Sequence, residues 1–121
     1  MGELTVETRH LEGVTLLYPR GFINAHNVRL FESELQRVLE QGQFKLVVNC
    51  ADLAYIASAG LGAIMGAIEE IRDHGGDLRL AGLNATVLNI FEILGMHRLY
   101  RIFASEAEAI QSFLSLEGPA A

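Results

Sequence analysis

Alternating apolar and polar positions near the start of the chain predict an antiparallel β-hairpin over residues 3–18. The alternation begins at Leu4, and a second apolar run follows a turn at Glu12–Gly13. Pro19 is expected to end or interrupt this second strand, because proline lacks the backbone N–H that a sheet ladder uses. Residues 21–24 are expected to continue the sheet beyond the proline.

Apolar residues at helical spacing come next and predict an amphipathic helix that begins after Asn24, the expected N-cap. Gly42 is expected to end this helix. Leu30 falls outside the apolar stripe and is expected to be partly exposed. The stripe that faces the core consists of Val28, Phe31, Leu35, Val38 and Leu39.

The centre of the chain combines a buried strand, a short loop that contains Ser58, and a second amphipathic helix. The continuous apolar run over residues 44–50 predicts the strand, and the helix extends to about His74, where Gly75–Gly76 ends it. A further strand is expected over residues 77–83, which makes a βαβ unit with parallel strands and a right-handed crossover. The buried stripe of the helix is expected to be Leu61, Ile64, Met65, Ile68 and Ile71.

The last part of the chain predicts a helix, a short strand and a final helix. Asn84 is expected to cap the first helix and Gly95 to close it, before a strand over residues 99–103. Ser105-x-x-Glu108 forms a capping box for the final helix, and the tail from Glu117 is expected to fray. The buried face of the first helix is expected to be Val87, Leu88, Phe91 and Leu94.

These elements together predict an α/β fold with a mixed four- to five-stranded sheet and helices mostly on one face. The chain has 121 residues and no sign of a second-domain boundary. A single domain over residues 1–121 is therefore expected, with an ordered core of about 3–116.

One face of the central helix carries almost no side-chain bulk. Glycine costs about 1 kcal/mol relative to alanine inside a helix, so two glycines one turn apart require a reason. Either an element of the same fold packs tightly there, or the face is a docking surface with Ser58 at its rim; the sequence leaves both readings open. The small residues of this face are Ala59, Gly62, Ala63, Gly66 and Ala67.

Composition and charge narrow the classes of partner. The formal net charge of −6 disfavours a nucleic-acid partner or an anionic membrane surface. No charged-then-apolar signal segment opens the sequence, and no apolar stretch approaches the roughly 20 residues of a membrane span. The single cysteine, Cys50, has no partner for an internal disulfide. A cytoplasmic location without direct membrane insertion is expected.

Two motifs resemble parts of enzyme sites but lack the chemistry that those sites require. Gly60-x-Gly62-x-x-x-Gly66 lies roughly ten residues beyond the preceding strand, too far for a dinucleotide loop at the strand end. Ile56-Ala-Ser-Ala-Gly60 lacks the first glycine of a hydrolase elbow, and no base is placed to activate the serine. The four histidines show no metal-ligand spacing. The sequence therefore predicts a protein that is not an enzyme and uses no cofactor or metal.

Ser58 has two readings. It is a favoured residue type for a helix N-cap, a role worth about 1 kcal/mol. It is also a candidate phosphoacceptor, because a phosphate would lie at the positive end of the helix dipole, where the fold tolerates negative charge. The same residue can fill both roles.

Three segments together carry a resemblance that spans nearly the whole chain. They are Asp52 to Gly62 with the helix that follows, Gly75-Gly-Asp-Leu-Arg-Leu-Ala-Gly82, and Val87-Leu-x-x-Phe-x-x-x-Gly95. The chain resembles a STAS domain and, within that family, is most similar to bacterial anti-sigma factor antagonists. The family motif is commonly written D-S-[ST]-G-L-G; here Ala57 stands in place of its acidic residue and Ala59 in place of its second hydroxyl residue.

The resemblance implies a partner-switching regulator. In that family the unphosphorylated antagonist binds an anti-sigma factor that is also a serine kinase, phosphorylation of the motif serine ends the interaction, and a PP2C-type phosphatase restores it. The phosphoacceptor position falls on Ser58, and Asn24 stands near a position where the family often has aspartate. The residues that the resemblance assigns to partner binding are Asn24, Ala57, Ser58, Ala59, Gly60, Leu61, Gly62 and Gly66.

Two alternatives remain open from the sequence. The same fold could serve as a STAS subunit of a larger assembly, such as a lipid-transport complex or a stressosome-like particle. Alternatively, the chain could be a small phosphate- or nucleotide-binding module that uses the N-terminus of the central helix. The exposed Leu30 and the small-residue helix face also leave self-association open.

Overall fold

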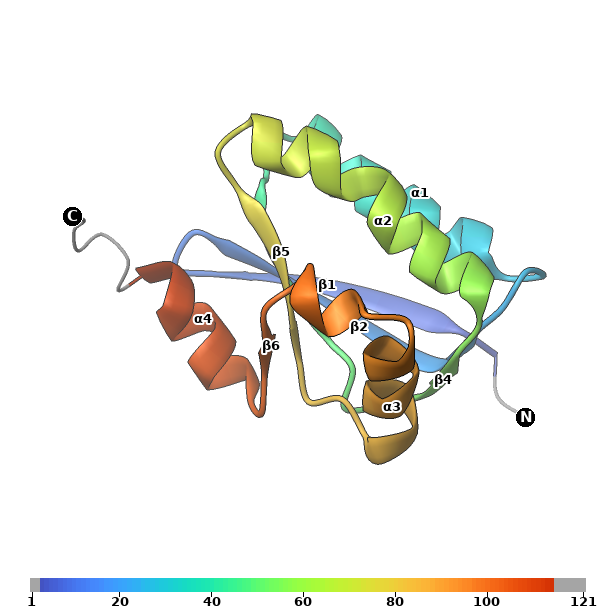
Figure 1. The fold of residues 1–121 in the computed structure, drawn as a ribbon. Coiled ribbons are helices and arrows are strands. Elements are labelled where there is room, and N and C mark those ends of the chain that lie inside the picture. The colour runs from blue at the N-terminus through green and yellow to red at the C-terminus, as the bar shows by residue number, and fades with distance from the viewer. Residues whose placement is uncertain (1–2, 115–121) are drawn as a thin grey trace.

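The structure is a computed structural model that describes residues 3–114, so the predicted frayed tail from Glu117 lies outside the described residues. A mixed sheet forms the centre of the fold, with four α-helices packed around it in the described part of the chain (Figure 1). The strands are β1 (Thr5–Leu11), β2 (Val14–Ile23), β3 (Lys45–Asn49), β4 (Leu53–Ile56), β5 (Asp77–Ala81) and β6 (Ile102–Phe103). The helices are α1 (Val28–Glu40), α2 (Ser58–Asp73), α3 (Ala85–Ile93), the 3₁₀ turn η1 (Met96–Arg98) and α4 (Glu106–Leu114).

The sheet has the order β1-β2-β3-β5-β6, with β4 paired to the end of β2. β1 and β2 are antiparallel, as the hairpin pattern predicts, and the other pairings are parallel. The unit β3-α2-β5 confirms the predicted βαβ connection between parallel strands. The mixed α/β class is therefore confirmed.

Strand β4 raises the number of strands to six and corrects the prediction of a loop between residue 50 and Ser58. Leu53 and Ile56 are buried, whereas Ala54 and Tyr55 between them are exposed. Four residues with this pattern are too short to show a period of two. Pairing with the end of β2, which the local sequence does not reveal, makes the segment a strand.

Pro19 does not end the second strand, which corrects another expectation. β2 continues through it to Ile23, and Pro19 lies opposite Val6 in the hairpin. On its other side β2 pairs with β3 over residues 15–17 and with β4 over residues 21–23. Pro19 lies in the interval between these two parallel partners, where a strand can accommodate a residue without an N–H.

Helices α1 and α2 lie side by side on one face of the sheet, and α4 lies on the opposite face (Figure 1). The larger apolar core lies under α1, α2 and α3 and includes the fully buried Phe31, Ile64 and Phe91. A smaller cluster forms under α4, where Ile110 and Phe113 pack against strand residues. The prediction that most helices share one face is confirmed.

Several helix details also differ from the predictions. α1 begins at Val28 with Asn27 as its N-cap, three residues later than the predicted cap Asn24. Met65 and Leu94, predicted to be buried, are 49% and 57% exposed. The last predicted strand contracts to the two residues of β6. By contrast, the Asn84 cap, the Ser105-x-x-Glu108 cap and the partial exposure of Leu30 are confirmed.

Candidate functional site around Ser58

Ser58 is fixed between a strand and a helix. The backbone N–H of Ala57 donates to the carbonyl of Ile23 over 2.8 Å, which extends the β2–β4 ladder by one residue. Ala57 then serves as the N-cap of α2, and its carbonyl accepts from the N–H groups of Gly60 (2.9 Å) and Leu61 (3.2 Å). Ser58 is the first residue of the helix, and only the hydrogen-bonded Ala57 separates it from the end of β4.

The Ser58 hydroxyl does not cap the helix, which corrects the N-cap reading. The cap position belongs to Ala57, which has no hydroxyl, and no side-chain hydrogen bond caps α2. Ser58 is exposed, and its side chain makes no hydrogen bond within residues 3–114. An uncommitted, exposed hydroxyl at the positive end of a helix dipole is open to a phosphoryl donor, and the dipole favours the charge that transfer would add.

The structure places Asn24 and Ser58 just beyond the C-terminal ends of two paired strands, β2 and β4. Asn24 follows Ile23, and Ser58 follows Ala57, so the two residues flank a single ladder bond. The Asn24 side-chain oxygen accepts from the N–H groups of His26 (2.9 Å) and Asn27 (3.2 Å). This side chain therefore shapes the turn before α1.

The glycines of α2 fall into two groups, and the difference bears on the small-residue face. A Cβ added at Gly60 would lie 2.6 Å from a side-chain carbon of Ile56 and 2.8 Å from one of Ile23. Packing within the fold therefore requires glycine at position 60. At Gly62 and Gly66 an added Cβ would meet nothing within 4 Å, and both residues are exposed. Internal packing does not account for these two glycines.

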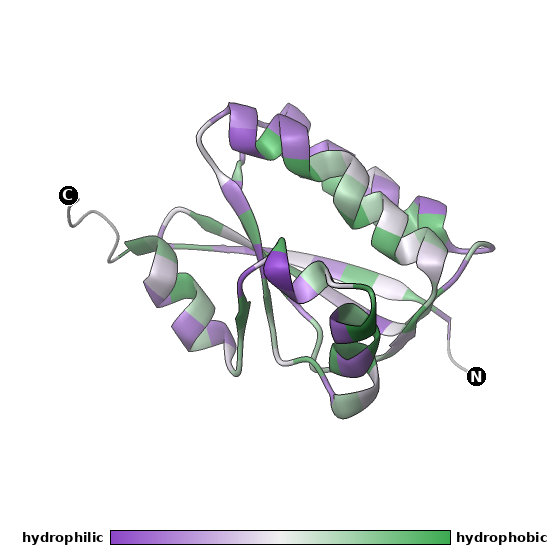
Figure 2. Cartoon of the chain, in the orientation of Figure 1, coloured by the Kyte–Doolittle hydropathy of each residue, from purple (hydrophilic) through white to green (hydrophobic). Residues whose placement is uncertain are grey.

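A groove runs along Gly62 and Gly66 between α1 and α2, with a volume of about 240 Å³. Its floor is small and apolar, with Ala63, Ala67 and the edge of Leu35 between the two helices. Glu32 and Gln36 of α1 border one side, and Glu70 of α2 lies at the C-terminal end. Figure 2 shows that α2 changes along its length, from apolar and neutral residues near its start to hydrophilic residues near its end.

The predicted site residues contribute in different ways. Ser58, Gly62 and Gly66 are exposed, and Asn24, Ala57 and Ala59 are half-buried. Gly60 and Leu61 are buried, so they shape the site from beneath and offer a partner little surface. Sequence reasoning did not find Glu32 and Gln36, because they reach the groove from α1 and belong to no motif; nor did it find the exposed Met65.

Residues 3–114 contain no cluster of three or more His, Cys, Asp or Glu side chains that could hold a metal ion. Cys50 is buried, and burial raises the pKa of its thiol to about 12. None of the helices that the structure describes has both the length and the apolar composition needed to cross a bilayer.

The chain is similar in sequence to known anti-sigma factor antagonists along most of its length. The chain is 25% identical over 108 residues to the anti-sigma-B factor antagonist of Bacillus subtilis, covering 89% of this chain and 98% of that protein. It is 23% identical over 108 residues to the anti-sigma F factor antagonist of Paenibacillus polymyxa, covering 88% and 92% of the two chains.

The fold also matches solved structures. The anti-sigma factor antagonist SpoIIAA of Bacillus in its unphosphorylated form superposes with a TM-score of 0.78 at 20% identity, over 97% of this chain and 100% of that one. Its phosphorylated form gives a TM-score of 0.69 at 20% identity, over 92% and 99% of the two chains. The model of the STAS domain family matches residues 5–109. The chain belongs to the STAS domain family.

Proposed function

We propose that this protein is an anti-sigma factor antagonist that works by partner switching in the cytoplasm. It binds an anti-sigma factor with serine kinase activity through the surface formed by Ser58 and the groove along Gly62 and Gly66. Phosphorylation of Ser58 ends the complex, and a PP2C-type phosphatase restores the binding form. The chain itself acts as a regulator and catalyses no reaction.

One observation carries this proposal: an exposed, uncapped Ser58 lies beside two helix glycines above which there is open space. Glycines that internal packing does not require are explained if a partner approaches the helix backbone closely at Gly62 and Gly66. A phosphate on Ser58 would bring roughly −1.5 to −2 charge to the end of this surface. The names of the relatives support the same role.

The alanines on both sides of Ser58 bear on how the kinase recognises it. Ala57 and Ala59 supply neither a carboxylate nor a second hydroxyl to the phosphoryl-transfer site. Recognition must then come from the docked surface as a whole, with Ser58 presented by the rigid start of α2. We therefore expect binding to precede phosphorylation and to be necessary for it.

The test uses the purified anti-sigma factor kinase of the same organism, with and without ATP and Mg²⁺. Wild-type protein should gain one phosphoryl group, mapped to Ser58, and the Ser58→Ala variant should gain none while still binding. Ser58→Asp should keep the fold and weaken binding about a hundredfold. Ser105→Asp is the matched control, because it adds the same charge at the exposed start of α4 and preserves the cap there.

Undiminished binding by Ser58→Asp would contradict the switch. Binding to the kinase without any phosphorylation would favour the alternative of a constitutive STAS subunit in a larger assembly. Failure to bind the kinase, together with saturable binding of a nucleotide that Ser58→Asp abolishes, would favour a phosphate- or nucleotide-binding module.

A further inference from the structure

Strand β1 forms one edge of the sheet and has an unpaired side. Its seven residues pair with β2 on one side only, and no strand within residues 3–114 covers the other. Such an edge presents a row of free backbone N–H and C=O groups and is a template for pairing with another strand. Charged side chains normally protect exposed edges of this kind.

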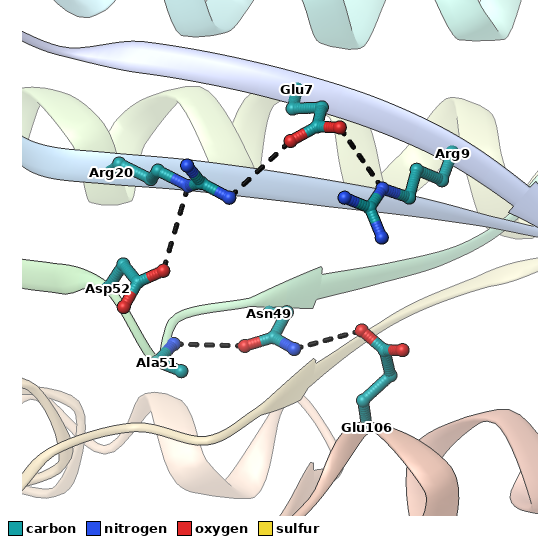
Figure 3. Close-up of polar contacts among 7 residues, drawn as sticks. All are labelled: Glu7, Arg9, Arg20, Asn49, Ala51, Asp52 and Glu106. Atoms are coloured by element: carbon teal, nitrogen blue, oxygen red, sulfur yellow. Dashed lines mark hydrogen bonds and ion pairs between the residues drawn. The ribbon is translucent and has the colours of Figure 1, made fainter.

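The charges on β1 have both signs and lie on one face. Glu7 and Arg9 are two residues apart and project to the same side of the strand, where Glu7 pairs with Arg9 (3.1 Å) and with Arg20 of β2 (3.5 Å) (Figure 3). The side chains of Glu7 and Arg9 are 46% and 60% exposed, respectively. Exposed ion pairs of this type are weak and can be shared with a further partner.

The charge pattern of β1 is self-complementary when two copies of the strand pair antiparallel about Thr8. If two copies of β1 pair antiparallel with Thr8 opposite Thr8, each Glu7 lies opposite the Arg9 of the other copy. Directly opposite residues of unlike charge stabilise a strand pair, and a threonine pair is also favourable. A shift of one strand by two residues keeps the same faces together but places either Glu7 opposite Glu7 or Arg9 opposite Arg9. A one-residue slip would set α1 of one copy against the α4 face of the other.

We propose that β1 is an interface between two copies of this chain, which join their sheets through antiparallel β1–β1 pairing centred on Thr8. The interface is isologous, since the same strand serves both copies, and its two-fold axis closes the assembly at a dimer. It goes beyond the proposed function, because the surface around Ser58 takes no part in it.

Helix α1 adds an apolar contact to this interface. The Thr8 hydroxyl donates to Glu34 of α1, so this side of α1 lies over the edge strand. Leu30 lies one helical turn before Glu34, on the same side of α1, and is 48% exposed. Joining the sheets in the proposed register places the two α1 helices on the same face of the joined sheet, where Leu30 offers an apolar surface to the other copy.

The dimer leaves the surface around Ser58 accessible. α1 packs against β1, β2 and α2, whereas α2 packs against α1, β4 and β5. The first turn of α2 is therefore separated from the β1 edge by the width of α1. Each copy in the dimer keeps its own Ser58 for a partner.

Sedimentation equilibrium of the full chain and of charge-reversal variants tests the proposal. Wild-type protein should show a concentration-dependent dimer below about 1 mM. Glu7→Arg and Arg9→Glu alone should each raise the dissociation constant about tenfold or more, because like charges then lie opposite one another. An equimolar mixture of the two variants should recover the dimer as a heterodimer, and the double variant should recover a homodimer.

Glu69→Arg on α2 is the control for a change of net charge away from the interface and should dimerise as wild type does. Circular dichroism of each variant confirms that the monomer is folded. A wild-type chain that stays monomeric to about 1 mM would overturn the proposal. So would single reversals that leave dimerisation unchanged, or single variants that fail to recover a dimer when mixed.

Discussion

Asn24 and Asn27 each accept a hydrogen bond from the backbone N–H of the other. The side-chain oxygen of Asn27 accepts from the Asn24 N–H at 2.8 Å, and that of Asn24 accepts from the Asn27 N–H at 3.2 Å. This reciprocal pair locks the turn between the end of β2 and the start of α1. It also fixes the position of Asn24 next to the ladder bond that leads to Ser58.

The two asparagines should respond differently to replacement by aspartate. Asn24→Asp keeps the accepting oxygen, and the amide nitrogen it loses makes no hydrogen bond within residues 3–114, so the free energy of unfolding should change by less than about 0.5 kcal/mol. Asn27→Asp removes the donor to the Phe22 carbonyl (2.9 Å) and should cost about 1–3 kcal/mol. Urea unfolding measures both, and equal losses would contradict the assigned roles.

The glycines of α2 give a sharp contrast in stability. Gly66→Ala fills open space and improves helix propensity, so the free energy of unfolding should rise by up to about 1 kcal/mol. Gly60→Ala forces Ile56 and Ile23 apart and should destabilise the fold by about 1–3 kcal/mol. Denaturant unfolding of the two variants against wild type checks this prediction.

The same Gly66→Ala variant also tests the docking surface. If a partner packs on the helix backbone there, the more stable variant should bind the anti-sigma factor more weakly. Titration calorimetry with the unphosphorylated protein measures the affinity. A variant that gains stability and keeps full affinity would show that the groove lies outside the interface.

The two helix-start residues Ser58 and Asn84 should differ when replaced by alanine. Asn84 accepts from the Val87 N–H (2.8 Å) and donates to the Leu53 carbonyl (3.1 Å), so Asn84→Ala should cost about 1–2 kcal/mol. Ser58→Ala removes no cap and should change the free energy of unfolding by less than about 0.5 kcal/mol. Thermal unfolding compares the two, and a large loss for Ser58→Ala would restore a capping role for this serine.

Stability at high pH should depend on Tyr18. Burial, and then the nearby Glu106 carboxylate, raise the pKa of the Tyr18 phenol from 10.0 to about 12. The folded state favours the neutral phenol. The contribution of Tyr18 to the free energy of unfolding is therefore complete below pH 10 and is lost as the pH rises from about 10 to 12. Tyr18→Phe should therefore lose less stability over this interval, as measured by urea unfolding at several pH values.

Glu106→Gln provides the control for this titration. It removes the carboxylate whose hydrogen bond with the phenol, and then whose negative charge, raise the Tyr18 pKa after burial, so the pKa of Tyr18 should fall toward its ordinary value while burial maintains part of the shift. Ultraviolet absorbance of tyrosinate, with Tyr18→Phe subtracted, follows the ionisation. An unchanged Tyr18 pKa in Glu106→Gln would contradict this assignment.

Long periodic segments were predictable from the sequence, whereas features set by tertiary pairing were not. The stripe of α1 and the strands β3 and β5 lie where the pattern places them, because burial imposes a recognisable apolar pattern on the sequence. β4 was missed because its pairing with the end of β2, rather than its own four residues, makes it a strand. Met65 has the spacing of a core residue but lies where no described element covers α2.

The candidate site shows the same division. The position of Ser58 at the start of α2 was predicted, but its cap role was not correct, because the β2–β4 ladder continues to Ala57 and leaves Ala57 as the N-cap. The open space above Gly62 and Gly66 shows that internal packing does not require glycine at these two positions, and only the arrangement of α1 beside α2 reveals this. Glu32 and Gln36 were not predicted as site residues, because they line the groove only through the packing of α1 beside α2.

The ladder bond from Ala57 to Ile23 also bears on the lifetime of the proposed complex. Because a strand ends just before Ser58 and a helix begins at it, this residue has little conformational freedom to lose on association. A preorganised surface of this kind meets its partner without rearrangement, and changes at such a contact act mainly on the dissociation rate. At an ionic strength that screens long-range charge, phosphorylation of Ser58 should then shorten the residence time of the partner and leave the rate of encounter nearly unchanged, which surface plasmon resonance with Ser58→Asp would resolve.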